Sequence, residues 1–466
     1  MYSLLFLGLV SFALSLLLTP LVRNMAWHFG IVDQPDQQRK THSFPIPRIG
    51  GVAIFAAVNG AYGLLLIGRL SSGAIVSADL PLVLRLLPAL TIVFSIGIID
   101  DIISVRPWIR LAVETLAATF AWIGGLHITA IAGYSFSGVV ASFIFTVLWI
   151  VTCTNAINLI DGVDGLAAGV SLFAAVTMLI AALLDHNFPM ALAVVPLAGA
   201  LLGFLRFNFF PASIFLGDCG SLTLGFLLGC FGAVWTEKST TLLGLTAPLM
   251  VLAVPLLDVG LAVVRRLLRG QPIFVADNAH IHHKLLSLGL SPRHLLFVIY
   301  GICAFGSAAS LLLTINHNQD RDFVLIVVCL AAWLGLQHLG YTEFSVAKKM
   351  VFGGTIRSVL SAQLALEAFE QEVNADLTLT QCWEVICRTC PLFGFSGIVF
   401  DIDDVNRQWG LKTGWQARID FPGHGHISVW RESGVVNHAA AAVLFIDCVS
   451  RTFSQKLNCL ELVNRN

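Results

Sequence analysis

Residues 142–184 read SFIFTVLWIVTCT-NAINLIDGVDGLAAG-VSLFAAVTMLIAALL, where the polar segment 155–169 separates two long apolar runs. A helix needs roughly 17 to 25 mostly apolar residues to cross a bilayer. Acids and amides beside such runs are costly in lipid and usually mark function. We therefore predict that segment 155–169 joins two membrane helices and carries part of a functional site.

The composition of the whole chain agrees with a membrane protein. Of its 466 residues, 57% are hydrophobic and 12% are charged, and the mean hydropathy is +0.83. Soluble proteins carry about 25% charged residues, so this chain has too little polar surface for a soluble body of its size. The net charge of -1 provides no basic field, and we expect no nucleic-acid partner.

Several stretches are apolar enough to span a membrane. We predict eleven of them, near 2–22, 50–67, 82–99, 109–126, 137–154, 166–184, 190–205, 220–235, 242–264, 295–314 and 323–341. The fold class expected is therefore an all-α polytopic membrane protein with about eleven transmembrane helices. A small soluble α+β domain follows at its C-terminal end.

The distribution of positive charge predicts the orientation. When the eleven spans alternate, twelve Lys and Arg residues before the tail fall on one side and four on the other. Positive loops stay in the cytoplasm, so we expect the N-terminus outside and the C-terminal domain inside. All the polar clusters fall on this cytoplasmic side, whereas a transporter more often places its polar groups near the midplane.

The composition changes after residue 341. Residues 342–466 contain 24 Asp, Glu, Lys or Arg in 125 positions, against 31 in the first 341. We predict a membrane domain over 1–341 and a cytoplasmic α+β domain over 342–466. The patterns predict two helices and three strands in it, at 358–374, 436–459, 396–402, 415–421 and 426–431. This order is similar to the GAF or PAS sensory class in architecture, and its role stays open.

The polar residues of the opening segment have a regular spacing. Asn155, Asn158, Asp161 and Asp164 are three apart, and helical residues three apart share a face. Helix capping or simple solvation would explain one such residue. It is a poor explanation for four of them at one spacing, so we expect a ligand-binding face.

Further acids end or begin other predicted spans. Asp100 and Asp101 end the third span, and adjacent helical residues point about 100° apart. One of them could bind metal or a proton while the other pairs with a base, Arg106, Arg110 or Lys40. Asp218 lies in the Gly-rich turn FLGDCGS, which suits a divalent cation that carries a phosphate. For Asp100 and Asp101 alone, two solvated acids at a helix exit are the alternative, and the FLGDCGS turn by itself is a weak signal.

Two basic segments could contact phosphates. The loop RKTHSFPIPRIGG contains Lys40 and Arg48, and the motif HIHH contains His280, His282 and His283. The histidines could bind zinc or donate hydrogen bonds to phosphate oxygens, and the nearby acids favour a harder cation than zinc. The first loop could instead be a plain cytoplasmic anchor.

The motifs GIIDD, NAINLIDGVDGLAAG, FLGDCGSLTLG and HIHHKLL, together with PIPRIGG, resemble the polyprenyl-phosphate N-acetylhexosamine-1-phosphate transferases over residues 1–341. The resemblance implies a bacterial inner-membrane enzyme that transfers a sugar-1-phosphate from a UDP-sugar to undecaprenyl phosphate and releases UMP. It implies Mg²⁺ as the cofactor, with Mn²⁺ as an alternative. The product would start a lipid-linked glycan, such as a cell-wall polysaccharide or lipopolysaccharide.

The resemblance also implies roles for individual residues. The acidic pair engages the lipid phosphate or metal, and we take it as catalytic: Asp100 and Asp101. The metal ligands expected are Asp218 and Asn158. The nucleotide-sugar site would comprise Asp161, Asp164, Asn155, Asn208 and Phe215. The residues near the diphosphate and sugar would be His280, His282, His283, Arg48 and Lys40.

The substrate and the function class have alternatives. The HIHHKLL form resembles the branch that uses UDP-N-acetylglucosamine (UDP-GlcNAc), and the phospho-MurNAc-pentapeptide transferases that make lipid I are the runner-up. An ion-coupled transporter is the alternative of another class, and a catalytically inactive sensor is disfavoured because no motif acid is missing. The partners expected are the UDP-sugar, the polyprenyl phosphate and the membrane, and homodimerisation stays open.

Overall fold

The protein divides into two compact units, Met1–Leu339 and Gly340–Asn466. The computed structural model describes residues 2–34, 44–67, 73–131, 134–135, 138–238, 252–268, 280–315, 326–327, 329–331, 334–335, 355–374, 378–431 and 439–464. Lys40 of the predicted phosphate loop lies outside these residues. Each unit has its own hydrophobic core, and the two are described separately.

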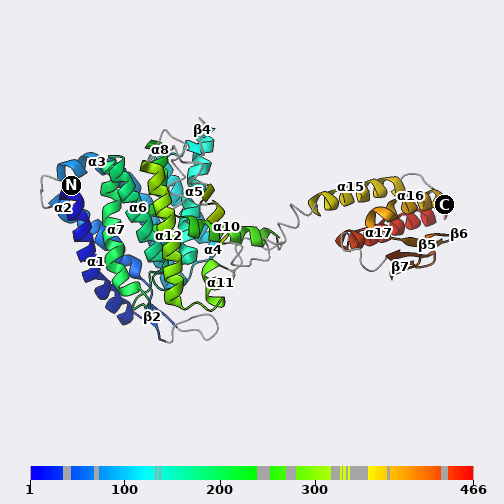
Figure 1. Cartoon of the computed structure of the whole chain (residues 1–466), viewed down its shortest axis with the longest axis horizontal. Coiled ribbons are helices and arrows are strands. Elements are labelled where there is room, and N and C mark those ends of the chain that lie inside the picture. Colours follow the sequence, from blue (N-terminus) through cyan, green and yellow to red (C-terminus); the bar gives the residue numbers. More distant parts are fainter. Residues whose placement is uncertain are drawn as a thin grey trace. The chain divides into compact units, whose positions relative to one another are not determined.

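The first unit is a bundle of helices that run side by side (Figure 1). Its helices are α1 (Tyr2–His28), α2 (Gly50–Ile67), α3 (Gly73–Ile103), α4 (Pro107–Ile123), α5 (Val139–Ile160), α6 (Leu166–Leu184), α7 (Phe188–Asn208), α8 (Gly217–Lys238), α10 (Ala253–Leu268), α11 (Ile281–Ser287) and α12 (Pro292–Ile315). Two short antiparallel pairs accompany them, β1 (Val32–Asp33) with β2 (Ile46–Pro47) and β3 (Ala130–Ile131) with β4 (Tyr134–Ser135).

Eight helices in the described residues are long and apolar enough to cross a membrane. They correspond to eight of the eleven predicted spans, so the polytopic architecture is confirmed. The span predicted at 109–126 is α4, a helix of 17 residues that is not among the eight. Of the span predicted at 242–264, the described part contains the shorter apolar helix Ala253–Val263. The span predicted at 323–341 lies mostly outside the described residues.

Helix α8 lies at the centre of the bundle. It packs against α2, α3 and α5, and 83% of its spanning segment is buried, the largest share among the eight helices. A Cβ atom on Gly51 of α2 would lie 2.2 Å from the backbone nitrogen of Gly220, so the two backbones touch there. This close approach fixes the first turn of α8, which carries Asp218, against the membrane entry of α2.

The second unit is an α+β domain. It contains α15 (Thr355–Asn374), α16 (Leu379–Thr389), the 3₁₀ turn η1 (Cys390–Phe393), β5 (Gly397–Ile402), β6 (Val405–Gly410), β7 (Trp415–Phe421), β8 (Gly425–Arg431) and α17 (Ala439–Asn464). The strands form one antiparallel sheet in the order β6-β5-β8-β7. Side chains of β5, β7 and β8 join those of the helices in one core, with Phe400, Ile427, Phe445 and Phe453 fully buried.

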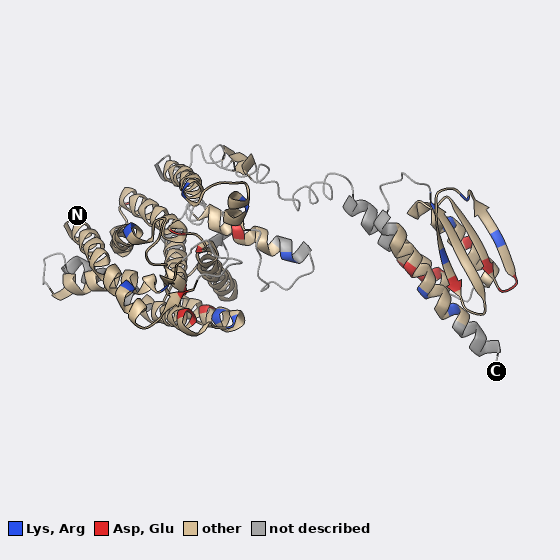
Figure 2. Ribbon diagram, turned by 90° about the horizontal axis from the view of Figure 1, so that it is seen from below, with Lys and Arg blue, Asp and Glu red and all other residues tan. Residues whose placement is uncertain are grey.

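The two units differ in how they carry charge. Figure 2 shows charged residues spread along the helices and strands of the second unit, whereas long stretches of the first unit's helices carry none. Three strands and two helices of the second unit were predicted and are present. Strand β6 was missed because its sequence, VNRQWG, is exposed along most of its length and has no apolar alternation. Helix α16 was missed as well, although Thr378 and Gln381 form a capping box at its start.

Candidate active site

A cavity of about 380 Å³ opens where α5 ends and α6 and α8 begin. This volume lies within the range of ordinary small-molecule sites. Nine of the predicted site residues line it: Arg48, Asp101, Asn158, Asp161, Asp164, Asn208, Phe215, Asp218 and His283. Asp100, Asn155, His280 and His282 do not line it. Asp33, on β1, lines the cavity and was not predicted from the sequence.

The turn between α5 and α6 places two carboxylates at this cavity. Helix α5 ends at Ile160, so Asp161 and Asp164 lie in the turn that follows it. The prediction of one continuous helical face from 155 to 164 is therefore wrong beyond Asn158. The turn is instead fixed from outside, because Asp164 Oδ2 accepts a hydrogen bond of 2.9 Å from the backbone N–H of Ala212.

Asp161 lies among other acids. Burial raises its pKa well above the usual range for Asp, and the neighbouring carboxylates of Asp218, Asp101 and Asp164 add to this effect. Such crowding disfavours the charged form of Asp161. A divalent cation in the cavity would relieve the repulsion and favour the ionised carboxylates.

Asp101 caps the start of α8. Its Oδ1 accepts a hydrogen bond of 2.9 Å from the backbone N–H of Asp218, and its Oδ2 accepts one of 3.0 Å from that of Cys219. A carboxylate at a helix N-terminus satisfies orphan N–H groups and interacts favourably with the helix dipole. The backbone carbonyl of Asp101 accepts a hydrogen bond from Arg48 Nη2. Asp101 thus holds in place the turn that carries Asp218.

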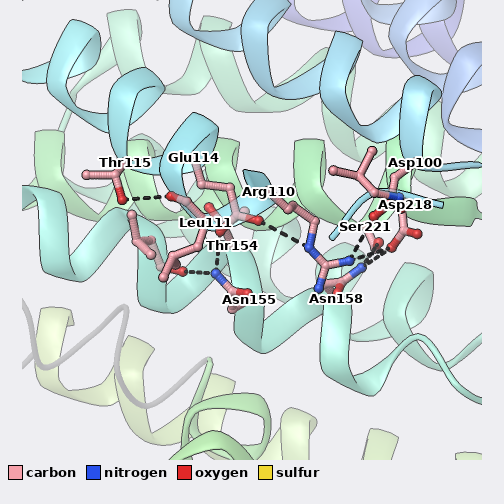
Figure 3. A network of polar contacts seen from close by, with 12 residues as sticks. Asp100, Arg110, Leu111, Glu114, Thr115, Thr154, Asn155, Asn158, Asp218 and Ser221 are labelled. Atoms are coloured by element: carbon pink, nitrogen blue, oxygen red, sulfur yellow. Dashed lines mark hydrogen bonds and ion pairs between the residues drawn. The ribbon is translucent and has the colours of Figure 1, made fainter. Parts of the chain in front are cut away.

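Asp100 has different partners, as the angle between adjacent helical residues predicts. Its Oδ1 accepts from the backbone N–H of Val105 at 2.6 Å, and its Oδ2 accepts from Arg110 Nη1 at 3.0 Å. The expectation that one acid of the pair binds a nearby base is confirmed for Asp100 and Arg110. Figure 3 shows that Arg110 reaches from α4 toward both Asp100 and Asp218.

Asp218 is the more accessible acid of this network, with 31% of its side chain exposed. Its Oδ1 accepts a hydrogen bond of 2.5 Å from Asn158 Nδ2, which also donates to Ser221 Oγ at 2.9 Å. The same oxygen lies 3.7 Å from Arg110 Nη1. Asn158 and Asp218, predicted as a metal-binding pair, are therefore in direct contact at the cavity wall.

Asn155 does not line the cavity, and its side chain contacts α4 instead (Figure 3). Its Nδ2 donates to Oε2 of Glu114, which is 1% exposed, and to the carbonyl of Val151. Glu114 Oε1 in turn lies 3.7 Å from Arg110 Nε. Sequence reasoning gave Glu114 no role, although a lone acid in an apolar stretch is a signal of function.

The loop between α7 and α8 forms another wall of the cavity. Phe215 pairs with the segment before α2, since its N–H donates to the carbonyl of Pro47 and its carbonyl accepts from Gly50. Buried Asn208 donates from Nδ2 to the carbonyl of Ile214 at 2.9 Å. These bonds join the Arg48 segment to the loop that precedes Asp218.

The histidines of HIHH have distinct positions. Asp258 of α10, which is 1% exposed, accepts from His280 Nδ1 at 3.1 Å and from the backbone N–H of Ile281 at 2.9 Å. His282 is buried against Gly162, and His283 is exposed and lines the cavity. Burial lowers the pKa of His282 to about 4, and the neighbouring His283 and His280 contribute to this shift. Asp258 was missed, although it too is a lone acid in an apolar stretch.

The side chains around the cavity would fit a magnesium ion. Among the described residues, no three His, Cys, Asp or Glu side chains form a metal site by themselves. Mg²⁺, however, is usually held by one or two carboxylates and completes its shell with water and substrate phosphates. Asp218 and Asp161 supply such carboxylates to one cavity, where acids crowd one another.

Comparison with known proteins places this geometry in a family. A probable undecaprenyl-phosphate N-acetylglucosaminyl 1-phosphate transferase of Bacillus subtilis is 36% identical over 327 residues, which cover 68% of this chain and 88% of that protein. This chain belongs to the polyprenyl-phosphate N-acetylhexosamine-1-phosphate transferase family. The model of glycosyl transferase family 4 matches residues 83–236, from α3 to α8. The family predicted from the motifs is thus confirmed.

Other members of the transferase family support the same assignment. A decaprenyl-phosphate N-acetylglucosaminephosphotransferase of Mycobacterium tuberculosis is 34% identical over 65% of this chain and 81% of its own length. The undecaprenyl-phosphate alpha-N-acetylglucosaminyl 1-phosphate transferase of Escherichia coli K12 is 27% identical over 67% of this chain and 84% of its own length. The names of these relatives state that they act on a polyprenyl phosphate and on N-acetylglucosamine.

Proposed function

We propose that this protein transfers N-acetylglucosamine-1-phosphate from UDP-GlcNAc to a polyprenyl phosphate and releases UMP. The observation that carries the proposal is the acidic cavity at the C-terminal end of α5 and the N-terminal end of α8. Asp161, Asn158 and Asp218 all line this cavity. Helices long and apolar enough to cross a membrane end at this cavity, so we expect a lipid phosphate to reach it from the bilayer. Relatives from three bacteria are named for this chemistry with a polyprenyl phosphate.

The reaction makes one phosphorus–oxygen bond and breaks another. An oxygen of the polyprenyl phosphate attacks the phosphorus that carries the sugar, and the bond from this phosphorus to the oxygen of UMP breaks. The product is a polyprenyl diphosphate that carries the sugar. A lipid phosphate is already largely ionised at neutral pH, so positioning and charge neutralisation matter more than a strong base.

The chain's own residues would divide this work. Arg110 lies between Asp100 and Asp218 and is placed to neutralise phosphate charge. Asp101 holds the first turn of α8, and Arg48 and His283 line the cavity where the diphosphate and sugar would lie. A bound Mg²⁺, held by Asp218 and Asp161, would neutralise charge on the diphosphate.

The location follows the distribution of positive charge. We propose a bacterial inner-membrane protein whose cavity and second unit face the cytoplasm, because most Lys and Arg of the loops fall on that side when the eleven predicted spans alternate. UDP-sugars are made in the cytoplasm, which agrees with this orientation. The polar residues of the cavity gather at one end of the helices, an arrangement that favours an enzyme over the transporter alternative.

The first experiment measures UMP release by the purified full chain in detergent with undecaprenyl phosphate, Mg²⁺ and UDP-GlcNAc. Asp218→Asn removes a carboxylate from the cavity and should lower the rate by about 100-fold or more. The matched control is Asp185→Asn, since Asp185 is an exposed acid at the C-terminal end of α6, whereas the cavity lies at the N-terminal end of this helix. It should keep the rate of the unchanged protein.

The outcomes separate the alternatives. Release that requires lipid, metal and Asp218 supports the proposed reaction. Release with UDP-MurNAc-pentapeptide and not with UDP-GlcNAc would replace it with lipid I synthesis. If no UDP-sugar gives UMP, the enzyme proposal fails, and solute uptake by proteoliposomes that depends on Asp161 would favour the transporter.

A further inference from the structure

Helix α4 carries one buried acid, Glu114, that the proposed reaction does not use directly. Its side chain is 1% exposed, and the buried residues of the next turns, Ala117, Ala118 and Ala121, are apolar. A carboxylate among such neighbours is costly unless polar and charged groups contact it. Glu114 does not line the cavity, so a substrate bound there does not supply these contacts. Its partners within the chain therefore indicate its role.

Two groups contact the carboxylate of Glu114. Asn155 of α5 donates from Nδ2 to Oε2, and the same Nδ2 donates to the carbonyl of Val151 at 3.0 Å. Oε1 lies 3.7 Å from Nε of Arg110, one helical turn earlier on α4. This oxygen accepts no hydrogen bond from the described residues, and Arg110 is the cation that pairs with it. The amide thus fixes one oxygen and leaves the other facing the guanidinium.

The guanidinium of Arg110 lies between Glu114 and the wall of the cavity. Its Nε faces Glu114, whereas its Nη1 donates to Asp100 at 3.0 Å and lies 3.7 Å from Asp218 Oδ1 (Figure 3). A guanidinium is planar and carries its five N–H donors in a fixed fork, so a contact at Nε sets the direction of the other donors. Because an arginine side chain is long and flexible, the contact with Glu114 favours the rotamer that reaches Asp218.

We infer that Glu114, held by Asn155, is a positioning residue that keeps the guanidinium of Arg110 directed at the phosphate that is transferred. The inference rests on the proposed function, since that function supplies the phosphate. Glu114 touches no substrate in this arrangement, and it acts through Arg110. Asn155 then belongs to this support and not to the nucleotide-sugar site.

The kinetic test removes the charge of Glu114 and keeps its size. In Glu114→Gln, the side-chain oxygen can still accept from Asn155, but no carboxylate faces Nε of Arg110. The kcat for UMP release should fall about tenfold, because a misplaced group lowers the rate of the chemical step. The KM for UDP-GlcNAc should stay unchanged. An unchanged kcat in a folded Glu114→Gln protein would overturn the inference.

The matched control for this substitution is Thr115→Val. Thr115 is the next residue of α4, and its side chain is exposed. The substitution keeps the size of the side chain and removes a polar group, as Glu114→Gln removes a charge. Because Thr115 has no contact with Arg110, this variant should keep the kcat of the unchanged protein.

A double variant separates positioning from a purely structural role. Arg110→Gln removes the guanidinium through which Glu114 acts. Adding Glu114→Gln to Arg110→Gln should therefore not lower kcat further, although Glu114→Gln lowers kcat when Arg110 is present. If Glu114 only stabilised the fold, the two losses would multiply, and this result would overturn the inference.

A labelling test does not depend on turnover. Phenylglyoxal modifies arginine side chains, and mass spectrometry of the full chain measures the modification of Arg110, which is 22% exposed. Glu114→Gln should raise the rate of modification of Arg110 severalfold and leave that of Arg48 unchanged, because only Arg110 loses a contact. Equal modification of Arg110 in the folded variant and in the unchanged protein would overturn the inference. Since this readout needs no substrate, it stays separate from a failure of UMP release.

Discussion

At the scale of single residues, the acids around the cavity have different roles. Both carboxylate oxygens of Asp101 accept hydrogen bonds from the first turn of α8. The carboxylate of Asp100 accepts hydrogen bonds from Val105 and Arg110. Asp218 and Asp161 remain directed at the cavity. The sequence identified all four acids but could not assign these tasks, because each depends on which backbone N–H or guanidinium the fold brings near.

The buried histidine gives a prediction at this scale. His282 is 3% exposed, its Nδ1 has no hydrogen-bond partner among the described residues, and burial lowers its pKa to about 4 from 6.5. The unfolded chain then binds more protons than the folded protein between these values. The free energy of unfolding should fall as the pH drops from 6.5 toward 4, by up to about 3 kcal/mol from this residue.

The measurement is the melting temperature of the purified protein in detergent as a function of pH. The melting temperature of His282→Gln should depend less on pH below 6.5 than that of the unchanged protein, because the variant has no imidazole at this position to protonate. His294→Gln is the control, since His294 is exposed on α12, and it should keep the dependence of the unchanged protein. An identical pH dependence in all three proteins would contradict the assignment of His282.

At the scale of elements, periodicity and hydropathy were enough to locate eight of the membrane helices. They did not locate the end of α5, beside which the cavity lies. The spacing of three from Asn155 to Asp164 continues past Ile160, but the helix does not. The turn is held by Ala212 and by Tyr300, whose hydroxyl donates to the carbonyl of Gly165. Because these hydrogen-bond partners are far from the turn in the sequence, the local residue pattern does not reveal them.

Two glycines of α2 test how closely this helix must approach α8. A Cβ on Gly51 would lie 2.2 Å from the nitrogen of Gly220, whereas a Cβ on Gly63 would meet no atom within 4 Å. Gly51→Ala should therefore lower the melting temperature and the rate of UMP release, because the turn that carries Asp218 must move. Gly63→Ala should be neutral or stabilise the protein by up to about 1 kcal/mol.

Both variants are compared in one detergent, with melting temperature and UMP release measured on the same samples. The matched change, Gly to Ala in one helix, separates crowding from helix propensity. Equal melting temperatures and rates in the two variants would contradict a backbone contact between α2 and α8.

At the scale of the whole molecule, the change in charged residues predicted a second domain, and the chain does divide into two compact units. Every residue that lines the cavity belongs to the first unit. The second unit has a separate core of its own. The sequence predicted its α+β content, but the sheet order depends on pairing between distant strands, which composition does not reveal.

Removal of residues 342–466 should therefore leave the chemistry in place. We expect the shortened protein to release UMP in detergent, with KM for UDP-GlcNAc close to that of the full chain. Size-exclusion chromatography and the melting temperature check that it is folded. A folded shortened protein without activity would show that the second unit completes the active site.

The burial of α8 also bears on how the protein is made. Among the eight membrane helices, α8 has the lowest hydropathy and the largest buried share. A helix that meets neighbours instead of lipid can carry polar residues such as Asp218 and Ser221, but it gains less by entering the bilayer alone. Its partners α2, α3 and α5 all precede it in the chain. During synthesis, the helix that carries Asp218 would therefore enter the membrane after α2, α3 and α5, and it would pack against these helices instead of lipid.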